Sequence, residues 1–157
     1  MNREIRKLWQ SFSCAFRGFS SCVHTERNLR IHLTAAFYVT VFALIGGLGA
    51  LRCAVLCLCF SGVMSAELLN TAIERLCDRQ ATGYDMLVRE AKDIAAAGVV
   101  VCAGFCVVVG ALFFLYEGAL WSALLFLWEH RAAAAALLAS IPAALWFVFR
   151  FHGRNRL

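Results

Sequence analysis

The stretch IAAAGVVVCAGFCVVVGALFFLY, residues 94–116, decides the fold of this chain because it carries no charged side chain. A helix that crosses the hydrocarbon core of a bilayer needs roughly 20 consecutive apolar residues, and this run is long enough. Backbone N–H and C=O groups find no water inside a bilayer, so a crossing segment of this kind satisfies them by forming a helix. The run therefore predicts a membrane-spanning helix.

Three other stretches share this character. Residues 33–51, 53–66 and 132–149 contain no Asp, Glu, Lys or Arg, and the second stays largely apolar as far as Ile73. Of the 157 residues, 62% are hydrophobic and 16% are charged, whereas a soluble domain has about 45–50% apolar residues. We therefore expect an all-α integral membrane bundle, with spans at residues 31–51, 53–77 and 92–116 and a fourth span at residues 132–150.

The segment before the first span is amphipathic. Large apolar side chains recur every three or four residues, at Ile5, Leu8, Trp9, Phe12, Phe16 and Phe19. This pattern is typical of a helix that lies in the membrane interface, and we expect that helix at residues 4–22. The opposite, cationic side could serve as an anchor or help to hold a polyanion such as ATP. Because the first apolar run follows this long basic lead, we expect no signal peptide.

Positive charge is unevenly distributed among the connections. Most Lys and Arg residues precede the first span, separate the second from the third, or follow the fourth, where they include Arg154 and Arg156. The other two connections hold one arginine each, Arg52 and Arg131. Cytoplasmic loops carry the excess of Lys and Arg, so we expect both chain ends and the central loop in the cytoplasm. The net charge of +5 follows from this topology and requires no nucleic acid.

The second span ends in polar residues at helical spacing. In AELLNTAIERLCD, residues 66–78, three- and four-residue steps place four polar side chains on one helix face: Glu67, Asn70, Glu74 and Asp78. An ionisable residue at membrane depth is costly and by default marks a functional site. Asp78, and Glu74 with it, could instead belong to a solvated helix end. For Glu67, which has apolar neighbours on both sides, we favour a functional role.

Carboxylates and an amide at a membrane surface suit the binding of a divalent cation. Mg²⁺ prefers oxygen ligands and commonly binds one or two carboxylates together with substrate phosphates. A further carboxylate could accept a proton from an acceptor hydroxyl. Lys92 and Asp93 begin the third span, and Glu26 lies at the same membrane level before the first span. The set suits phosphoryl transfer between a nucleotide and a lipid. The sequence contains no G-x-x-x-x-G-K-[ST] motif, so helices would have to build any ATP site.

Three motifs occur in order: ERNLRIH at residues 26–32, AELLNTAIERLCD at 66–78 and AKDIAAAGVVV at 91–101. Together they resemble the prokaryotic diacylglycerol kinase and undecaprenol kinase family, and the resemblance covers residues 11–115. It implies a membrane lipid kinase domain at residues 1–117, with a surface helix and three spans. It also implies MgATP as the phosphate donor, a homotrimer with shared sites, and a cytoplasmic active site in the bacterial inner membrane. The chain departs from the family in residues 118–157, an extension with an interfacial segment and the fourth span.

The resemblance also implies roles for single residues. Glu67 resembles the proposed catalytic base that faces the lipid hydroxyl. The implied metal ligands, which bridge to the ATP phosphates, are Glu26 and Glu74. The implied site-organising residues are Asn70 and Asp78. The implied nucleotide-binding residues are Lys92, Asp93, Lys7 and Gly18.

Other residues receive structural interpretations. We expect Arg30 to anchor the first span at the interface and Thr71 to bind a backbone carbonyl. The eight cysteines form no C-x-x-C pair, so we interpret them as small hydrophobic packing residues rather than as metal ligands or disulfides.

The acceptor lipid is the least constrained part of the prediction. ERNLRIH has His32 where the diacylglycerol branch usually has an acidic residue, so we favour undecaprenol, with diacylglycerol as the alternative. A small proton- or cation-coupled transporter is an alternative of another class. Against it, the carboxylates gather at one side, and apolar residues such as Val55 and Leu58 lie where an outward path would run. A purely structural role would leave Glu67 and Lys92 unexplained.

Overall fold

The computed structural model describes residues 2–80, 83 and 85–151, so Arg154 and Arg156 lie outside the described residues. The elements in chain order are α1 (Arg3–Thr25), α2 (Arg27–Ile45), α3 (Ala50–Gln80), α4 (Met86–Ala111), the π-helical turn η1 (Leu112–Tyr116), α5 (Ala119–Glu129) and α6 (Arg131–Arg150). Within these described residues, four helices are long and apolar enough to cross a membrane: α2, α3, α6, and α4 continued by η1. The expected all-α membrane bundle is confirmed.

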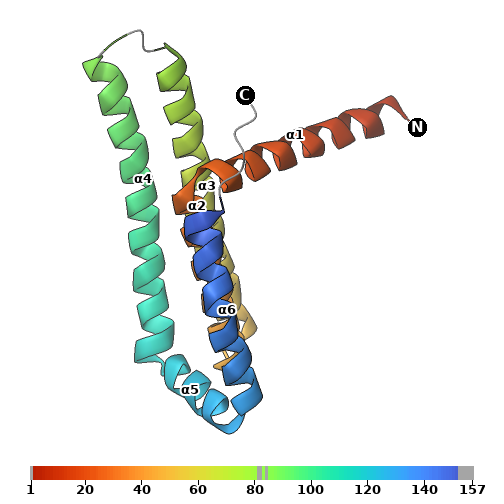
Figure 1. Ribbon diagram of the computed structural model, residues 1–157, viewed down its shortest axis with the longest axis vertical. Coiled ribbons are helices and arrows are strands. Elements are labelled where there is room, and N and C mark those ends of the chain that lie inside the picture. Colours follow the sequence, from red (N-terminus) through yellow and green to blue (C-terminus); the bar gives the residue numbers. More distant parts are fainter. Residues whose placement is uncertain (1, 81–82, 84, 152–157) are drawn as a thin grey trace.

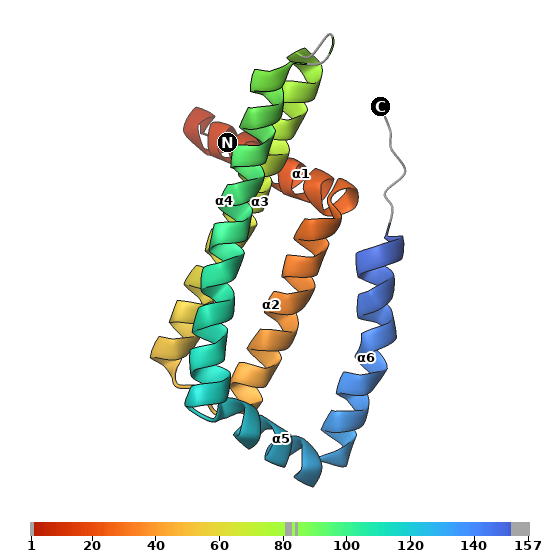
Figure 2. The ribbon, with the colours of Figure 1, turned by 90° about the vertical axis from the view of Figure 1, so that its left-hand side faces the viewer.

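The spans run side by side, and the other two helices mark the two ends of the bundle. Helices α3 and α4 form an antiparallel pair, α2 lies beside them, and α6 lies beside α2 (Figure 1, Figure 2). Helix α1 projects sideways near one end, which also holds the end of α3, the start of α4 and the end of α6. We call this end the site end. The opposite, far end holds α5 and the α2–α3 turn.

Glycines end the first span and bring the extension against it. Helix α2 ends at Ile45 and is capped by Gly46, and Gly47 adopts φ +73°, a left-handed conformation that side chains disfavour. A Cβ at Gly46 would lie only 2.5 Å from the backbone carbonyl oxygen of Ala119 at the start of α5. These glycines explain why the first span ends earlier than its apolar run, which continues to Leu51. The close approach also seats α5 on the end of α2.

The extension first lies at the far end and then returns along α2. Helix α5 has 11 residues, roughly 16 Å of helix, which is too short to cross the bilayer. Its Trp128 ring lies under the Arg131 guanidinium at 4.3 Å, and both suit a membrane interface. Helix α6 then packs on α2, where the Tyr38 hydroxyl lies 2.8 Å from the Ser140 hydroxyl. The extension is therefore part of the bundle.

The prediction that Arg30 anchors the span at the interface is wrong. Its side chain is 3% exposed and donates hydrogen bonds to backbone carbonyls at the ends of α1 and α6. Residue type and position at a helix entry suggested an exposed cation. Only the packing of α1 and α6 around α2 encloses it.

Candidate active site

The polar face of α3 reaches the membrane boundary because the helix is longer than the bilayer core is thick. Its 31 residues make roughly 46 Å of helix, whereas the hydrocarbon core is about 30 Å thick. Counted from Ala50 at the far end, Glu67 lies roughly 26 Å along the axis and Asp78 roughly 42 Å. The part of α3 from Glu67 onward therefore passes from lipid depth through the headgroup region.

Glu67 is the most enclosed carboxylate of the cluster. Only 2% of its surface is exposed, and the neighbouring Asn70 and Thr71 are also buried. The Thr71 hydroxyl donates to the Glu67 backbone carbonyl at 3.0 Å, which confirms the interpretation of Thr71. The groups that act on the Glu67 carboxylate are Glu26 from the α1–α2 corner, Asn28 from α2 and Glu74 from α3 itself.

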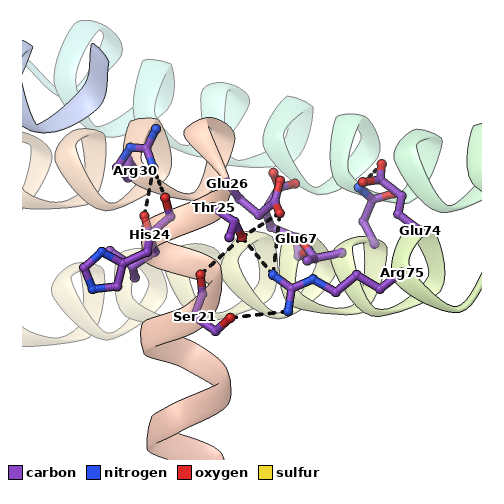
Figure 3. A network of polar contacts seen from close by, with 11 residues as sticks. Ser21, His24, Thr25, Glu26, Arg30, Glu67, Glu74 and Arg75 are labelled. Carbon is purple, nitrogen blue, oxygen red and sulfur yellow. Dashed lines mark hydrogen bonds and ion pairs between the residues drawn. The ribbon is translucent and has the colours of Figure 1, made fainter. Parts of the chain in front are cut away.

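Glu26 comes to Glu67 from the break between two helices. It is the single non-helical residue between α1 and α2, with φ −98° and ψ 114°. Both Glu26 and Glu74 lie close enough to Glu67 for their charges to act on its carboxylate, and the Asn28 side chain lies beside it. Figure 3 shows the three carboxylates along the crossing of α1, α2 and α3. Neighbouring like charges repel one another, and a cation near them, such as the Arg75 guanidinium at 3.8 Å from Glu26 Oε1, reduces that repulsion.

Asn70 links this cluster to the next turn of α3. Its Nδ2 donates to Glu74 Oε1 at 3.0 Å, while its Oδ1 is buried and has no hydrogen-bond partner among the described residues. A buried acceptor without a partner costs about 1–3 kcal/mol. A ligand that brings a cation or a donor to this oxygen would remove that cost.

The donor set fits Mg²⁺ only in part. Within the described residues, no group of three or more His, Cys, Asp or Glu side chains is arranged to hold a metal ion by itself. Glu26, Glu74 and the free Asn70 Oδ1 are oxygen donors, which Mg²⁺ prefers, and the ion usually completes its shell with water and substrate phosphates. The chain therefore offers an incomplete site of the kind that a nucleotide would complete.

Arg75 joins α3 to the end of α1, and the sequence reasoning missed it. Its guanidinium donates to Thr25 Oγ1 at 2.8 Å and to Ser21 Oγ at 3.4 Å, and it lies 3.8 Å from Glu26 Oε1 (Figure 3). Thr25 Oγ1 also lies 2.8 Å from that Glu26 oxygen. The signal in the sequence was a pair of arginines one helical turn apart, Arg75 and Arg79, at the polar end of a span. Arg75 therefore helps to hold Glu26 against α3.

A groove of about 550 Å³ opens between α1 and α3 beside this network. Its walls are apolar apart from Thr71, Arg75 and Arg79, and Gly18 forms part of the α1 side. Apart from its chain neighbours and its own helix backbone, a Cβ at Gly18 would meet no heavy atom of the described residues within 4 Å. The groove thus combines apolar surface with two cations, next to the carboxylate cluster of Glu26, Glu67 and Glu74.

The predicted nucleotide-binding residues are not all brought together. Lys92 Nζ donates to Asp78 Oδ1 at 2.7 Å, and the Glu74 charge also acts on this lysine. Asp93 is 74% exposed and pairs with Arg89 at 3.9 Å on α4 itself. Lys7 pairs with Glu4 on the outer part of α1, roughly 28 Å along that helix from Glu26. Lys92 and Asp78 therefore adjoin the cluster, whereas Lys7 lies far from it within one chain.

The fold and site together define a class: a helical membrane protein with one buried carboxylate, two half-buried carboxylates and basic side chains at one end of its bundle. Residues 13–114 match the family model described as prokaryotic diacylglycerol kinase. The chain is 36% identical over 112 residues to undecaprenol kinase of Bacillus subtilis, covering 71% of this chain and 91% of that protein. It is 40% identical over 109 residues to diacylglycerol kinase of a Synechocystis species, covering 69% of this chain and 62% of that protein.

The chain therefore belongs to the prokaryotic diacylglycerol kinase family and is a membrane lipid kinase. This confirms the resemblance drawn from the three motifs. It also favours lipid phosphorylation over the transporter and structural alternatives. The match ends before α5 and α6, so the extension lies outside the part that the family model describes.

Proposed function

We propose that this lipid kinase transfers the γ-phosphate of MgATP to the hydroxyl of undecaprenol, with Glu67 as the general base. The observation that carries the proposal is the position of Glu67. The residue is 2% exposed, and its carboxylate lies near the headgroup boundary, where the charges of Glu26 and Glu74 act on it. A lipid hydroxyl and a soluble nucleotide can meet at this depth, and an enclosed carboxylate is suited to take a proton there.

The proposed reaction needs no covalent enzyme intermediate. Glu67 accepts the proton of the lipid hydroxyl while that oxygen bonds to the γ-phosphorus. The bond between the γ-phosphorus and the β–γ bridging oxygen breaks, and ADP leaves with the electron pair. Positioning and charge stabilisation supply most of the catalysis in phosphoryl transfer. The protein's part is therefore to hold the two substrates in line beside Glu67.

The nucleotide would lie against the site end. Glu26 and Glu74, with the free Asn70 Oδ1, would hold Mg²⁺. When bound, Mg²⁺ neutralises charge on the β- and γ-phosphates. Lys92 would exchange its hydrogen bond to Asp78 for one to a phosphate oxygen of the nucleotide. A carboxylate and a phosphate are both anionic acceptors for a lysine. Gly18 would let adenosine lie close to α1, where the groove is open.

Charge supports a cytoplasmic location for the site end. Within the described residues, the far end carries Arg52 and Arg131, whereas the site end carries a larger set of basic side chains: Arg17, Arg27, Arg30, Arg75, Arg79, Arg89, Lys92 and Arg150. Such an excess marks the cytoplasmic side. We further propose a homotrimer with shared sites. In that assembly Lys7, which lies far from Glu26, Glu67 and Glu74 of its own chain, and the exposed Asp93 would serve a neighbouring subunit's nucleotide.

Undecaprenol is favoured as the acceptor by two observations. ERNLRIH, which supplies Glu26 and Asn28, resembles that branch of the family, and the relative named undecaprenol kinase is matched over 91% of its length. Diacylglycerol is a second candidate because the Synechocystis relative is named diacylglycerol kinase.

A direct competition tests the proposal. Purified full-length protein in mixed micelles would receive labelled ATP and equal mole fractions of undecaprenol and 1,2-diacylglycerol. We expect labelled undecaprenyl phosphate as the main product, with kcat/KM at least about tenfold higher than for diacylglycerol, a difference of about 1.4 kcal/mol. The reverse preference would overturn the acceptor assignment, and phosphorylation of neither lipid would overturn the proposal as a whole.

A further inference from the structure

The C-terminal extension touches the corner that carries Glu26, and Arg30 makes the connection. From α2, the Arg30 guanidinium donates through Nη1 to the carbonyls of Val23 at 2.9 Å and His24 at 3.1 Å. Through Nε it donates to the carbonyl of Val148 at 3.2 Å. Val23 and His24 belong to the last turn of α1, and Val148 belongs to the last turn of α6. One buried side chain therefore joins the ends of two helices.

This contact has a clear physical basis. The last carbonyls of a helix have no partner within the helix, and they carry the negative end of its dipole. A guanidinium is a planar fork with several donors and a permanent positive charge. Arg30 can therefore satisfy carbonyls of α1 and α6 at once. A lysine has a single compact head and cannot bond all three carbonyls in this geometry.

An aromatic contact holds the same two ends together. Phe151, which follows α6, stacks on the His24 ring with centroids 4.8 Å apart and an interplanar angle of 23°. The rings of Trp146 and Phe147 lie 5.7 Å and 5.4 Å from Phe151 and support it from α6. Arg30 and Phe151 thus fix the end of α6 to the last turn of α1 by two different interactions.

The position of Glu26 depends on this corner. Glu26 directly follows the last turn of α1, and its backbone N–H donates to the Cys22 carbonyl at 2.7 Å. Its side chain must reach Glu67 and Glu74 on α3, so the angle between α1 and α2 sets the distance between the proposed metal ligands. A displaced last turn of α1 would carry Glu26 with it.

We propose that the extension braces the α1–α2 corner through Arg30 and Phe151 and thereby positions Glu26 for MgATP. The inference rests on the proposed role of Glu26 as a metal ligand. Arg30 and Phe151 are positioning residues, because they act through the backbone of α1. The fourth span would thus add tighter nucleotide binding to a kinase domain whose family match ends at residue 114.

A double-mutant cycle in the full-length chain tests the brace. The variants are Arg30→Lys, Phe151→Ala and the two combined, and the matched control is Phe149→Ala, whose side chain is 62% exposed on α6. We expect the KM for MgATP to rise about tenfold in Arg30→Lys and about threefold in Phe151→Ala, with a combined effect smaller than the product, as for coupled residues. At saturating MgATP, kcat and the KM for lipid should stay near wild type, and the control should be unchanged.

Amide hydrogen exchange gives a readout that does not depend on activity. Residues 22–30 should exchange faster in Arg30→Lys and Phe151→Ala, whereas residues 94–116 of the third span should not. Unchanged exchange at the corner, equally faster exchange in both segments, or effects on KM that multiply would each overturn the brace. Faster exchange confined to the corner with an unchanged KM would instead overturn the metal role of Glu26, and the positioning role with it.

Discussion

Replacing Glu67 by glutamine separates its chemical role from its packing. The substitution keeps the size of the side chain but removes its charge and its ability to accept a proton. Glu67 is almost fully enclosed, and both Glu26 and Glu74 act on it with the same sign of charge. A neutral amide relieves this repulsion. We therefore expect Glu67→Gln to fold as stably as the wild type and to bind MgATP at least as well.

The expected loss is in turnover. A positioned general base contributes roughly 10²–10⁴-fold to the rate, which corresponds to about 2.7–5.5 kcal/mol of activation free energy. We expect kcat of Glu67→Gln to fall by about 10²–10⁴-fold, with the KM for MgATP within about threefold of wild type. Initial rates of phosphate transfer from labelled ATP to lipid would give kcat and KM, and thermal unfolding in the same detergent would give Tm.

The matched control is Glu129→Gln, which removes the same charge from an exposed position at the end of α5, on the far end of the bundle. It should leave kcat unchanged. A Glu67→Gln enzyme that keeps kcat within about threefold of wild type would refute Glu67 as the base. If Tm of Glu67→Gln falls together with kcat, the lost activity reflects lost packing. That outcome would refute the expectation that the substitution removes only the chemical role of Glu67.

Three further predictions concern the metal ligands, the surface helix and the extension. Glu74→Gln should raise the Mg²⁺ concentration needed for half-maximal activity by at least about tenfold, since even indirect contacts to a metal cost about 10–100-fold; an unchanged Mg²⁺ titration would contradict the ligand role. In single-cysteine chains, a membrane-impermeant maleimide should label the exposed Cys14 much faster than Cys22. Cys22 is only 7% exposed, and burial raises the pKa of its thiol, so less of the reactive thiolate is present at neutral pH. Reaction of Cys22 should grow as pH rises towards that raised pKa, and equal rates at pH 7 would contradict the packing of α1. Gly46→Ala should destabilise the protein by about 1–3 kcal/mol, because its Cβ would lie 2.5 Å from the α5 backbone. Gly104→Ala is the control, because outside its own helix backbone and chain neighbours its Cβ would meet no atom of the described residues within 4 Å. An equal Tm for the two variants would contradict the close approach of α5 to α2.

The fold class and the polar face of α3, which carries Glu67, Asn70 and Glu74, could be predicted from the sequence. The uncharged runs predict spans because a bilayer leaves the backbone only internal hydrogen bonds. The steps from Glu67 to Asn70 and Glu74 place these residues on one face because a helix has 3.6 residues per turn. Both arguments depend only on neighbours along the chain and on the solvent, and neither needs a partner helix.

Tertiary packing alone decided which distant groups meet. Glu26 lies beside Glu67 because α1 and α2 break at one residue and cross α3 there. Arg30 is buried rather than interfacial because two helix ends, one of them 118 residues away, present their carbonyls to it. Arg75 reaches back to α1, whereas Lys7 pairs with Glu4 and stays far from Glu26, Glu67 and Glu74 of its own chain. The positions at which the helices cross and the directions in which they run set these contacts, and neither can be predicted from the local pattern of residues.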